Sequence, residues 1–414
     1  MKEAKGKISL ESYESFTRHL ADREYFGQKL GLERIGSILN RLGNPQEKFR
    51  SIHIAGTNGK GSTAAMLSAI LEEAGYKTGL YTSPHLEDFC ERIRVAGRLI
   101  DPEDVLKHAR LVREAETEAL TFFELATAIG FLYFAESGVD IAVVETGLGG
   151  RLDATNVIDP MLSLITTVGR DHTAHLGESF AEIAFEKAGI VKPGKPVVIG
   201  AMPDEATEVI REQASKKGAR FVPVVMDLIP PNIRIALEGT HQRRNANLAL
   251  SVIDVLNALG EIHVSREAVW RGLGAVECPG RLETTSDEPW ILLDGAHNPD
   301  AMRAVRDYLE ETLGGRRLKV LFGAMGDKEI GKILAEIAPL ASEFLLAAPD
   351  LERAASVETL RTHLEGFEGE VRSYASVAEA LEEEISLLLS DDVLLVTGSF
   401  YVVGEARRFL ASTS

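Results

Sequence analysis

A glycine-rich segment with one lysine and one serine is the part of the sequence best suited to chemistry. It reads GTNGKGS over residues 56–62 and lies between the apolar run 52–55 and a stretch that favours helix. Backbone N–H groups of such a loop can surround the β- and γ-phosphates, Lys60 adds a positive charge, and the hydroxyl of Ser62 is a ligand for Mg²⁺. The segment is shorter than G-x-x-x-x-G-K-[ST], so the alternative is an ordinary glycine-rich turn between a strand and a helix. We interpret it as a nucleoside triphosphate site.

Carboxylate and imidazole groups follow two other apolar runs. Glu145 ends the run 139–144 and precedes a glycine-rich turn, while Asp171-His172 follows the run 162–167. Ligands of open α/β sheets bind where parallel strands end, and Mg²⁺ prefers oxygen ligands. The pattern therefore predicts that Glu145 holds Mg²⁺ beside the phosphate loop, the alternative being a solvated strand end. Taken alone, His172 is more readily interpreted as a structural residue. The pair His172 and His175 has a spacing that would suit zinc, but no cysteine or further histidine completes a tetrahedral set.

Apolar runs alternate with amphipathic segments along the whole chain, and several runs are apolar on both faces, as buried parallel strands are. Asn298 before Pro299 is a typical helix start. The expected strands are 51–55, 77–81, 139–145, 162–167, 196–199, 290–293, 319–322, 343–347 and 392–397, and the expected helices include 62–74, 124–137, 298–313 and 400–410. The alternation predicts an α/β fold: a doubly wound, mostly parallel sheet that carries the phosphate loop, and a smaller Rossmann-like α/β domain.

Length, composition and net charge restrict the number of domains and the kinds of partner that the protein can have. The 414 residues suffice for two or three domains, and the polar segment 283–289 is the best linker, so we expect domains at 1–283 and 284–414. The net charge of −18 disfavours nucleic acid and requires metal ions and a few basic residues to attract ATP. No apolar stretch reaches the roughly 18 residues of a membrane span. With no leader-like start and two isolated cysteines, Cys90 and Cys278, we expect a cytoplasmic monomer that binds no membrane.

An ordered series of further motifs extends over nearly the whole chain. It comprises GLERI at 31–35, IHIAGTNGKGS at 52–62, YTSPHL at 81–86, TFFE at 121–124, ETGLGGRLDATN at 145–156, DHTAHLG at 171–177, EKAGIVKPG at 186–194, GTHQRRNA at 239–246, PGRLE at 279–283, LDGAHNP at 293–299 and TGSFYVVGEAR at 397–407. The series resembles the folylpolyglutamate synthase/dihydrofolate synthase family of the Mur ligase superfamily. The resemblance makes 1–283 an ATP-binding Mur-ligase-type central domain and 284–414 a glutamate-ligase domain.

The resemblance implies two Mg²⁺ sites. Ser83 and Glu145 would hold the first with the phosphates and Ser62, whereas Glu145 and His172 would hold the second with Lys187. From the sequence alone Lys187 is an exposed helix lysine, but the family pattern makes it a carbamate formed with CO₂. An ammonium group repels a dication, whereas a carbamate offers anionic oxygen ligands.

The remaining site residues also come from the resemblance. Lys60, Lys187 and His297 would contribute to catalysis, with His297 near the amino acid or the reacting phosphate. The residues expected to bind ATP are Thr57, Asn58, Gly59, Lys60, Gly61, Ser62, Asn245, Arg281 and Asp294. Those expected to line the pterin site are Thr121, Phe122, Phe123, Glu124, Leu152, Asp153 and Ala154.

The implied reaction joins L-glutamate to a folate-type carboxylate through an acyl phosphate formed with ATP. The motifs TFFE and LDATN favour an enzyme that accepts both dihydropteroate and reduced folates, although a single-activity member of the family stays open. Two other classes are less favoured. A non-catalytic P-loop module leaves the second domain unexplained, and a cell-wall Mur ligase would carry a further domain where only 55 residues precede Gly56.

Overall fold

The computed structural model describes residues 12–24 and 31–413. By internal contacts the chain divides into two compact units, the first Met1–Arg234 with Asn245–Val276 and the second Ile235–Arg244 with Glu277–Ser414. This division lies near the expected boundary between residues 283 and 284 but does not coincide with it. Compact units need not be folding domains, so the domain limits stay a prediction.

An eight-stranded sheet forms the centre of the first unit, in the order β4-β3-β2-β5-β1-β6-β7-β8. The strands from β2 to β8 along this order pair in parallel, and β3 and β4 are antiparallel additions at one edge. The strands are β1 (Arg50–Ala55), β2 (Thr78–Tyr81), β3 (Ile93–Val95), β4 (Arg98–Leu99), β5 (Ile141–Glu145), β6 (Leu162–Ile165), β7 (Val197–Ile199) and β8 (Phe221–Pro223). Because β5 lies between β1 and β2, the segments that follow these three strands are neighbours at one edge of the sheet.

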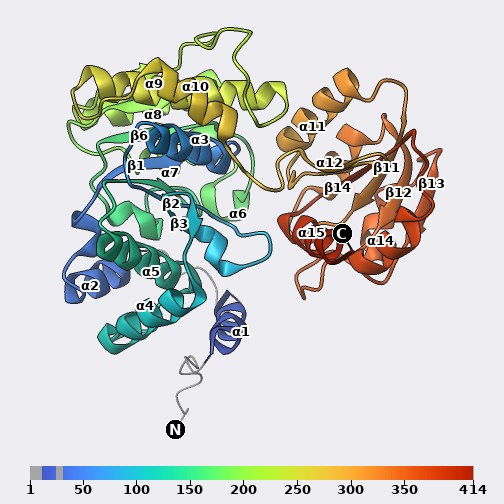
Figure 1. The fold of residues 1–414 in the computed structure, drawn as a ribbon, viewed down its shortest axis with the longest axis horizontal. Helices are drawn as coiled ribbons and strands as arrows, with labels where there is room; N and C mark the ends of the chain where they lie inside the picture. Colours follow the sequence, from blue (N-terminus) through green and yellow to red (C-terminus); the bar gives the residue numbers. More distant parts are fainter. Residues whose placement is uncertain (1–11, 25–30, 414) are drawn as a thin grey trace. The chain divides into compact units, whose positions relative to one another are not determined.

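Helices cover both faces of this sheet, with α3, α9 and α10 on one face and α4 and α5 on the other (Figure 1). Two aromatic side chains of α5, Phe131 and Phe134, belong to the same buried cluster as Val144 of β5. The sheet is therefore buried on both sides, which explains its nearly continuous apolar strands. The helices are α1 (Tyr13–Glu24), α2 (Glu33–Arg41), α3 (Lys60–Glu73), α4 (Pro102–Ala115), α5 (Phe122–Ser137), α6 (Thr173–Leu176), α7 (Phe180–Ala188), α8 (Asp204–Lys216), α9 (Thr240–Ala258) and α10 (Arg266–Ala275).

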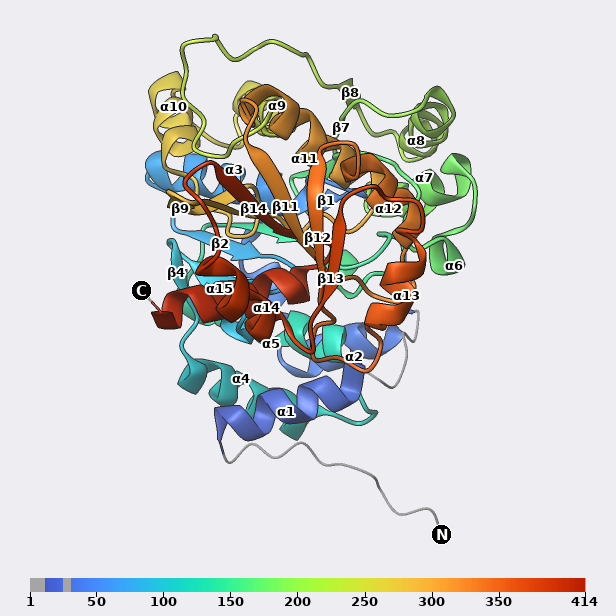
Figure 2. The same ribbon diagram turned by 90° about the vertical axis from the view of Figure 1, so that its right-hand side faces the viewer.

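The second unit has a six-stranded sheet in the order β13-β12-β11-β14-β10-β9, parallel except for β9. One apolar cluster joins α11, α12 and α13 to this sheet, and α14 and α15 lie on its other face (Figure 2). Its elements are β9 (Glu283–Asp287), β10 (Trp290–Leu293), α11 (Pro299–Thr312), β11 (Arg317–Phe322), α12 (Ile330–Ile337), β12 (Ala341–Leu346), α13 (Val357–Thr362), β13 (Glu370–Ser373), α14 (Val377–Ile385), β14 (Asp392–Thr397) and α15 (Phe400–Thr413).

The expected α/β class is confirmed, and a strand or helix occurs at every position named from the sequence. Asn298 caps α11, since its side chain accepts a hydrogen bond from the N–H of Ala301 over 2.9 Å. The expectation of a linker at 283–289 was wrong, because β9 occupies most of it and pairs with β10. The strands that the sequence did not reveal (β3, β4, β8, β9 and β13) are short or polar and lie at or near sheet edges.

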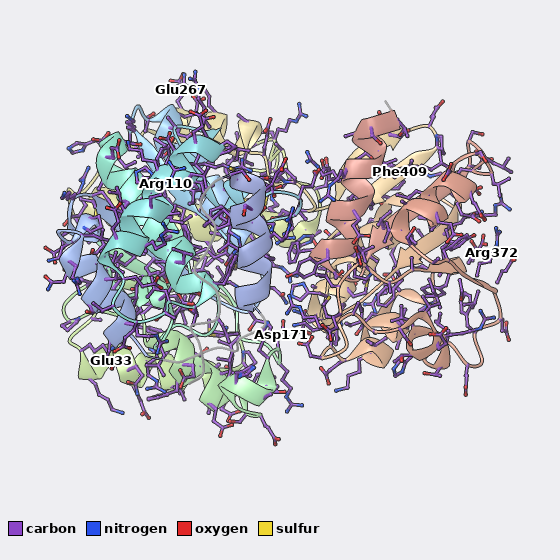
Figure 3. The ribbon with its side chains drawn as sticks, turned by 90° about the horizontal axis from the view of Figure 1, so that it is seen from below. Glu33, Arg110, Asp171, Glu267, Arg372 and Phe409 are labelled. Carbon is purple, nitrogen blue, oxygen red and sulfur yellow. The ribbon has the colours of Figure 1, made fainter. Side chains whose placement is uncertain are left out.

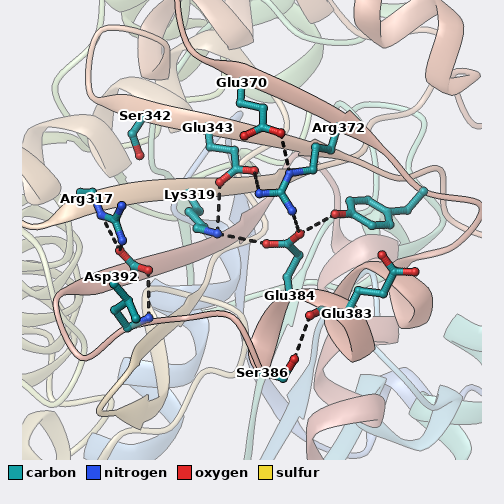
Figure 4. Close-up of polar contacts among 12 residues, drawn as sticks. Arg317, Lys319, Ser342, Glu343, Glu370, Arg372, Glu383, Glu384, Ser386 and Asp392 are labelled. Carbon is teal, nitrogen blue, oxygen red and sulfur yellow. Dashed lines mark hydrogen bonds and ion pairs between the residues drawn. The ribbon is translucent and has the colours of Figure 1, made fainter.

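A buried cluster of ion pairs connects β11, β12, β13 and α14 in the second unit (Figure 4). Lys319 Nζ lies 3.1 Å from carboxylate oxygens of both Glu343 and Glu384. Arg372 pairs with the same two carboxylates, and the hydroxyl of Tyr374 donates to Glu384 over 2.5 Å. The side chain of Glu384 is completely buried, so its charge depends on these partners.

Other charges lie at the surface, as Figure 3 shows for Glu33, Arg110 and Glu267, all of which are exposed. Within residues 12–24 and 31–413, no helix combines the length and apolar character that crossing a membrane requires.

Candidate active site

The predicted phosphate loop connects the buried strand β1 to α3. Gly59 adopts a left-handed conformation with φ of 82°, which glycine tolerates without strain, and α3 begins at Lys60. The ammonium of Lys60 donates to the carbonyls of Gly56 and Thr57 over 3.1 and 3.3 Å. The lysine therefore lies folded over its own loop, at the positive end of α3, where an anion would be stabilised.

The residues after β6 hold this loop in place. Thr57 Oγ1 donates to the carbonyl of Gly169 over 3.1 Å and accepts from its N–H over 2.9 Å. The N–H of Asn58 donates to Thr167 Oγ1 over 3.0 Å. A rigid loop presents its N–H groups to a ligand without first paying the entropy of ordering.

Close packing explains why glycine occupies positions 56 and 59. A Cβ at Gly56 would lie 1.9 Å from Thr166 Oγ1, and a Cβ at Gly59 would lie 2.5 Å from Asn245 Oδ1. Asn245, which the resemblance assigns to ATP binding, is therefore next to the loop expected to hold the phosphates. Ser62 is buried in the first turn of α3, and its contact with a phosphate-bound metal stays a prediction.

Glu145 connects three of the predicted groups. It ends β5, is 3% exposed, and its Oε1 lies 4.0 Å from Lys60 Nζ. The N–H of Ser83, in the loop after β2, donates to Glu145 Oε2 over 3.1 Å. The structure thus brings together Lys60, Ser83 and Glu145 from the ends of three adjacent strands. The neighbouring Thr146 Oγ1 is buried and has no hydrogen-bond partner in the part of the chain that the structure describes.

Lys187 is not the exposed lysine that its sequence context suggested. Its side chain on α7 is 2% exposed. The pKa of Lys187 is lowered from 10.5 to about 7, chiefly by burial and also by the charge of Lys60, while the charge of Asp171 acts in the opposite direction. A large fraction of the amine is therefore unprotonated near neutral pH, which is the form that can react with CO₂.

His172 lies directly before α6 with φ of 51°, an uncommon backbone conformation for a residue other than glycine. Its Nε2 lies 3.8 Å from Asp171 Oδ1, and the same oxygen accepts from its N–H over 2.9 Å. Figure 3 shows Asp171 in this segment. The charges of Lys60 and Asp171 both act on the pKa of Lys187, while convergence of Glu145, His172 and Lys187 on one ion stays a prediction.

The donor set fits a magnesium ion better than zinc. Among the residues described, no group of three or more His, Cys, Asp and Glu side chains could hold a metal ion. The predicted set contains two such residues, Glu145 and His172, with the hydroxyls of Ser62 and Ser83. Oxygen ligands of this kind suit a Mg²⁺ that also binds substrate phosphates. An ammonium at Lys187 would repel the ion, so the site fits only if that amine is neutral or carbamylated.

The start of α5 carries the predicted TFFE residues. Thr121 caps the helix, and its N–H donates to Glu124 Oε2 over 2.8 Å in a reciprocal capping box. Arg34 of α2, which the sequence did not single out, pairs with the other carboxylate oxygen of Glu124 over 3.1 Å. These contacts give Glu124 a structural role. The aromatic residues Phe122 and Phe123 are the part of this segment suited to a flat ligand.

Phe123 packs on the glycine-rich turn after β5, where a Cβ at Gly147 would lie 2.6 Å from Phe123 Cζ. Phe122 is buried, and Arg92 lies over its ring at 4.9 Å from the centroid. Arg92 also donates to His85 Nδ1 over 2.7 Å, and burial lowers the pKa of His85 to about 3. The contact between Arg92 and His85, like that between Arg34 and Glu124, was not indicated by the sequence alone.

The three residues 152–154 occupy different environments. Asp153 and Ala154 are buried, whereas Leu152 lines a small pocket together with Leu148, Gly149, Arg151, His175, Leu176 and Glu186. Burial raises the pKa of Asp153, and hydrogen bonds from Thr155 and from the N–H groups of Leu148 and Gly147 oppose the shift.

The second unit holds three predicted residues, two of which lie against the same phenylalanine. The guanidinium of Arg281 lies 4.3 Å from the centroid of Phe400, and the ring of His297 lies 5.3 Å from the same centroid. Asp294 is buried and accepts from the N–H groups of Leu282 and Ala296 over 2.9 and 2.8 Å. Burial raises the pKa of Asp294, and the charge of Arg281 opposes the shift.

Two family models match the chain: the Mur ligase middle domain over residues 54–228 and the Mur ligase glutamate ligase domain over residues 280–400. The chain is 36% identical to the dihydrofolate synthase/folylpolyglutamate synthase of Bacillus subtilis (strain 168), covering 96% of this chain and 99% of that protein. It is 33% identical to the protein of the same name from Escherichia coli (strain K12), covering 92% and 91% of the two chains.

Solved structures agree in fold over almost the full length. Escherichia coli FolC in complex with DHPP and ADP superposes with a TM-score of 0.89 at 30% identity, covering 97% of this chain and 98% of that one. The bifunctional folylpolyglutamate synthase/dihydrofolate synthase of Yersinia pestis, complexed with AMPPNP and a Mn ion, gives a TM-score of 0.87 at 29% identity, covering 98% and 100%.

Proposed function

Since the chain belongs to the folylpolyglutamate synthase/dihydrofolate synthase family of Mur ligases, we propose that it is an ATP-dependent ligase that adds L-glutamate to a folate-type carboxylate. The observation that carries the proposal is the meeting of Lys60, Ser83 and Glu145 at the end of three strands. The ammonium of Lys60 and the carboxylate of Glu145, which the N–H of Ser83 holds, can receive a triphosphate with its metal ion there. The similar structures hold ADP, AMPPNP and Mn, and one also holds L-glutamate.

The chemistry follows from the poor leaving group of a carboxylate. Phosphoryl transfer from ATP converts the acceptor carboxylate to an acyl phosphate, whose phosphate leaves readily when the amino group of glutamate attacks. Lys60 would move from the carbonyls of Gly56 and Thr57 to the phosphate oxygens, where its charge offsets the negative charge of the transition state. The products are an amide, ADP and phosphate.

Two Mg²⁺ ions are part of the proposal. Ser62, Ser83 and Glu145 would hold one ion with the phosphates, and Glu145, His172 and carbamylated Lys187 would hold the other. When bound, the ions neutralise phosphate charge and align the γ-phosphoryl group with its acceptor. The buried position of Lys187 and its pKa of about 7 support the carbamate, because the reacting amine must be unprotonated.

The acceptor is proposed to be dihydropteroate, reduced folates or both. Its pterin would lie against Phe123 and the segment 152–154, whereas Arg281, Asp294 and His297 would serve the nucleotide and the incoming amino acid. We also propose a monomer that acts in the cytoplasm. Neither Cys90 nor Cys278 forms a disulfide among the residues that the structure describes, which suits a reducing compartment.

Release of ADP from purified protein tests the proposal. We expect turnover only when Mg-ATP, L-glutamate and an acceptor are all present, with dihydropteroate and tetrahydrofolate assayed separately. Mass spectrometry should show a product longer by one glutamate residue. ADP release that needs neither glutamate nor a pterin would favour a nucleotide-binding module instead, and turnover with only one acceptor would identify a single-activity enzyme.

A further inference from the structure

A histidine is completely buried in the strand that leads to the phosphate loop. His53 lies in the middle of β1 and has no exposed surface. Burial lowers the pKa of His53 to about 3, with a smaller contribution from the charge of Lys192. The imidazole is therefore neutral, and its Nε2 lies 2.9 Å from Thr155 Oγ1.

The direction of this hydrogen bond follows from Asp153. Oδ2 of Asp153 accepts from the N–H groups of Gly147 and Leu148, each over 2.9 Å. Oδ1 accepts from the N–H of Thr155 over 3.0 Å and from its hydroxyl. These four donors occupy the positions that an ionised carboxylate offers, and their hydrogen bonds oppose the rise in pKa that burial causes at Asp153.

The single hydroxyl proton of Thr155 therefore points to Asp153, and Thr155 Oγ1 must accept from His53. This assigns the proton of the imidazole to Nε2. Nδ1 is then an acceptor only, and it has no hydrogen-bond partner in the described part of the chain. Both hydrogen bonds are thus donated towards Asp153: His53 donates to Thr155, and Thr155 donates to Asp153.

The network joins two parts of the predicted site. β1 continues directly into the phosphate loop, which begins at Gly56. At the other end, Asp153 holds the N–H groups of residues 147 and 148, which follow Glu145 by two and three positions. Phe123 packs on Gly147 with no room for a Cβ. Movement of this turn would therefore displace the surface proposed to bind the pterin.

We propose that His53 and Thr155 are positioning residues for the pterin acceptor, which they influence by holding Asp153 and the turn at 147–148 beneath Phe123. The inference rests on the proposed function and extends it to two residues that lie outside the assigned pterin-binding segments. Neither residue needs to touch the substrate. Substituting either residue should therefore weaken binding of the pterin acceptor and leave the KM for L-glutamate nearly unchanged.

Matched substitutions of Thr155 provide the test, because Thr155→Val has nearly the same shape without the hydroxyl and Thr155→Ser keeps the hydroxyl. With the full-length protein, we would measure kcat and the KM values for dihydropteroate and L-glutamate. We would also measure the Kd of dihydropteroate in the presence of Mg-ADP by fluorescence titration. We expect Thr155→Val to raise KM and Kd for dihydropteroate about tenfold and to leave the KM for glutamate within twofold. Thr155→Ser should stay within twofold of the unmodified protein throughout.

A second pair of variants separates positioning from folding. His53→Gln retains an N–H donor near the place of Nε2, whereas His53→Leu removes it. Both changes are expected to lower thermal stability, but only His53→Leu should raise the KM for dihydropteroate as Thr155→Val does. A purely structural role would reduce the active fraction, and hence kcat, without this division between the two variants.

The outcomes distinguish a failure of the proposed function from a failure of the positioning role. If the unmodified protein forms no glutamate adduct of any pterin acceptor, the proposed function fails. If it does so and Thr155→Val keeps a normal KM and Kd for dihydropteroate, the proposed function stands and the positioning role is refuted. Equal effects of Thr155→Val and Thr155→Ser would likewise refute it, because the hydroxyl would then not be the group that matters.

Discussion

Replacing Lys187 with methionine should stabilise the ligand-free protein at neutral pH. Methionine keeps an unbranched apolar side chain of similar length in the buried site on α7, but it has no charge to desolvate. In its unfolded form the lysine takes up a proton below about pH 10.5, whereas in the folded protein it does so only below about pH 7. Between these values the unfolded state binds more protons, so the free energy of unfolding falls as the pH is lowered from about 10.5 to about 7.

The size of the effect follows from the two pKa values. A pKa lowered from 10.5 to about 7 costs the folded state up to about 5 kcal/mol, because each pKa unit corresponds to 1.36 kcal/mol. Linkage places about 4 kcal/mol of this cost at pH 7.5 and about 1.4 kcal/mol at pH 9.5. Lys187→Met should remove the cost at both pH values, so its advantage over the unmodified protein shrinks as the pH rises.

Urea denaturation at pH 7.5 and 9.5 measures the difference, in buffers free of CO₂, nucleotide and divalent cations. Lys216→Met is the matched control, because Lys216 on α8 is 64% exposed and its loss should change stability by less than about 0.5 kcal/mol. The reasoning is refuted if Lys187→Met is no more stable than the unmodified protein at pH 7.5. It is also refuted if the difference between them does not shrink at pH 9.5.

Four further predictions concern catalysis and stability. Lys60→Ala should abolish ATP turnover while leaving the fold intact by circular dichroism, and near-normal ADP release would contradict the assignment of the phosphate loop. Lys187→Ala should be inactive but should recover part of its activity in added acetate, which supplies the carboxylate of the missing carbamate; activity that acetate does not change would exclude this role. Glu384→Gln should lower the free energy of unfolding by roughly 3 kcal/mol at pH 7, because it removes a buried negative charge that pairs with both Lys319 and Arg372. Burial raises the pKa of Glu384, but its hydrogen bonds and ion pairs outweigh burial and hold this pKa below 4.5, so the stabilisation is present above pH 4.5 and is lost progressively as the pH falls below it; a difference in denaturant midpoint that does not shrink between pH 7 and pH 3 would count against the ion pairs. Gly147→Ala should raise the KM for dihydropteroate severalfold because its Cβ would meet the ring of Phe123 at 2.6 Å, and an unchanged KM would contradict the proposed contact of this ring with the pterin.

The fold was predictable where local pattern and burial agree. Strands such as β5 and β14 are apolar on both faces, and only a sheet covered by helices on both sides accommodates them. The short and polar strands gave no such signal, because their stability comes from a neighbouring strand. The segment 283–289 shows this directly, since its polar composition predicts a linker while its pairing with β10 makes it a strand.

The candidate site was predictable in its chemistry but not in its internal support. Lys60 and Glu145 stand at strand ends, and that position follows from the sequence pattern. Lys187 lies on an amphipathic helix, and only the packed structure shows that it is buried. The contact of Arg34 with Glu124 spans 90 residues, and the contact of His53 with Thr155 spans 102. Spacing along one chain gives no signal for partners so far apart.

Transfer of oxygen from the acceptor to phosphate tests the ligase mechanism most directly. Dihydropteroate labelled with ¹⁸O in its carboxylate would be incubated with the protein, Mg-ATP and L-glutamate, and the released phosphate would be examined by mass spectrometry. Attack of the carboxylate on the γ-phosphoryl group predicts one ¹⁸O atom in each phosphate released. Phosphate without ¹⁸O, alongside normal amide formation, would contradict the acyl-phosphate route and the account built on it.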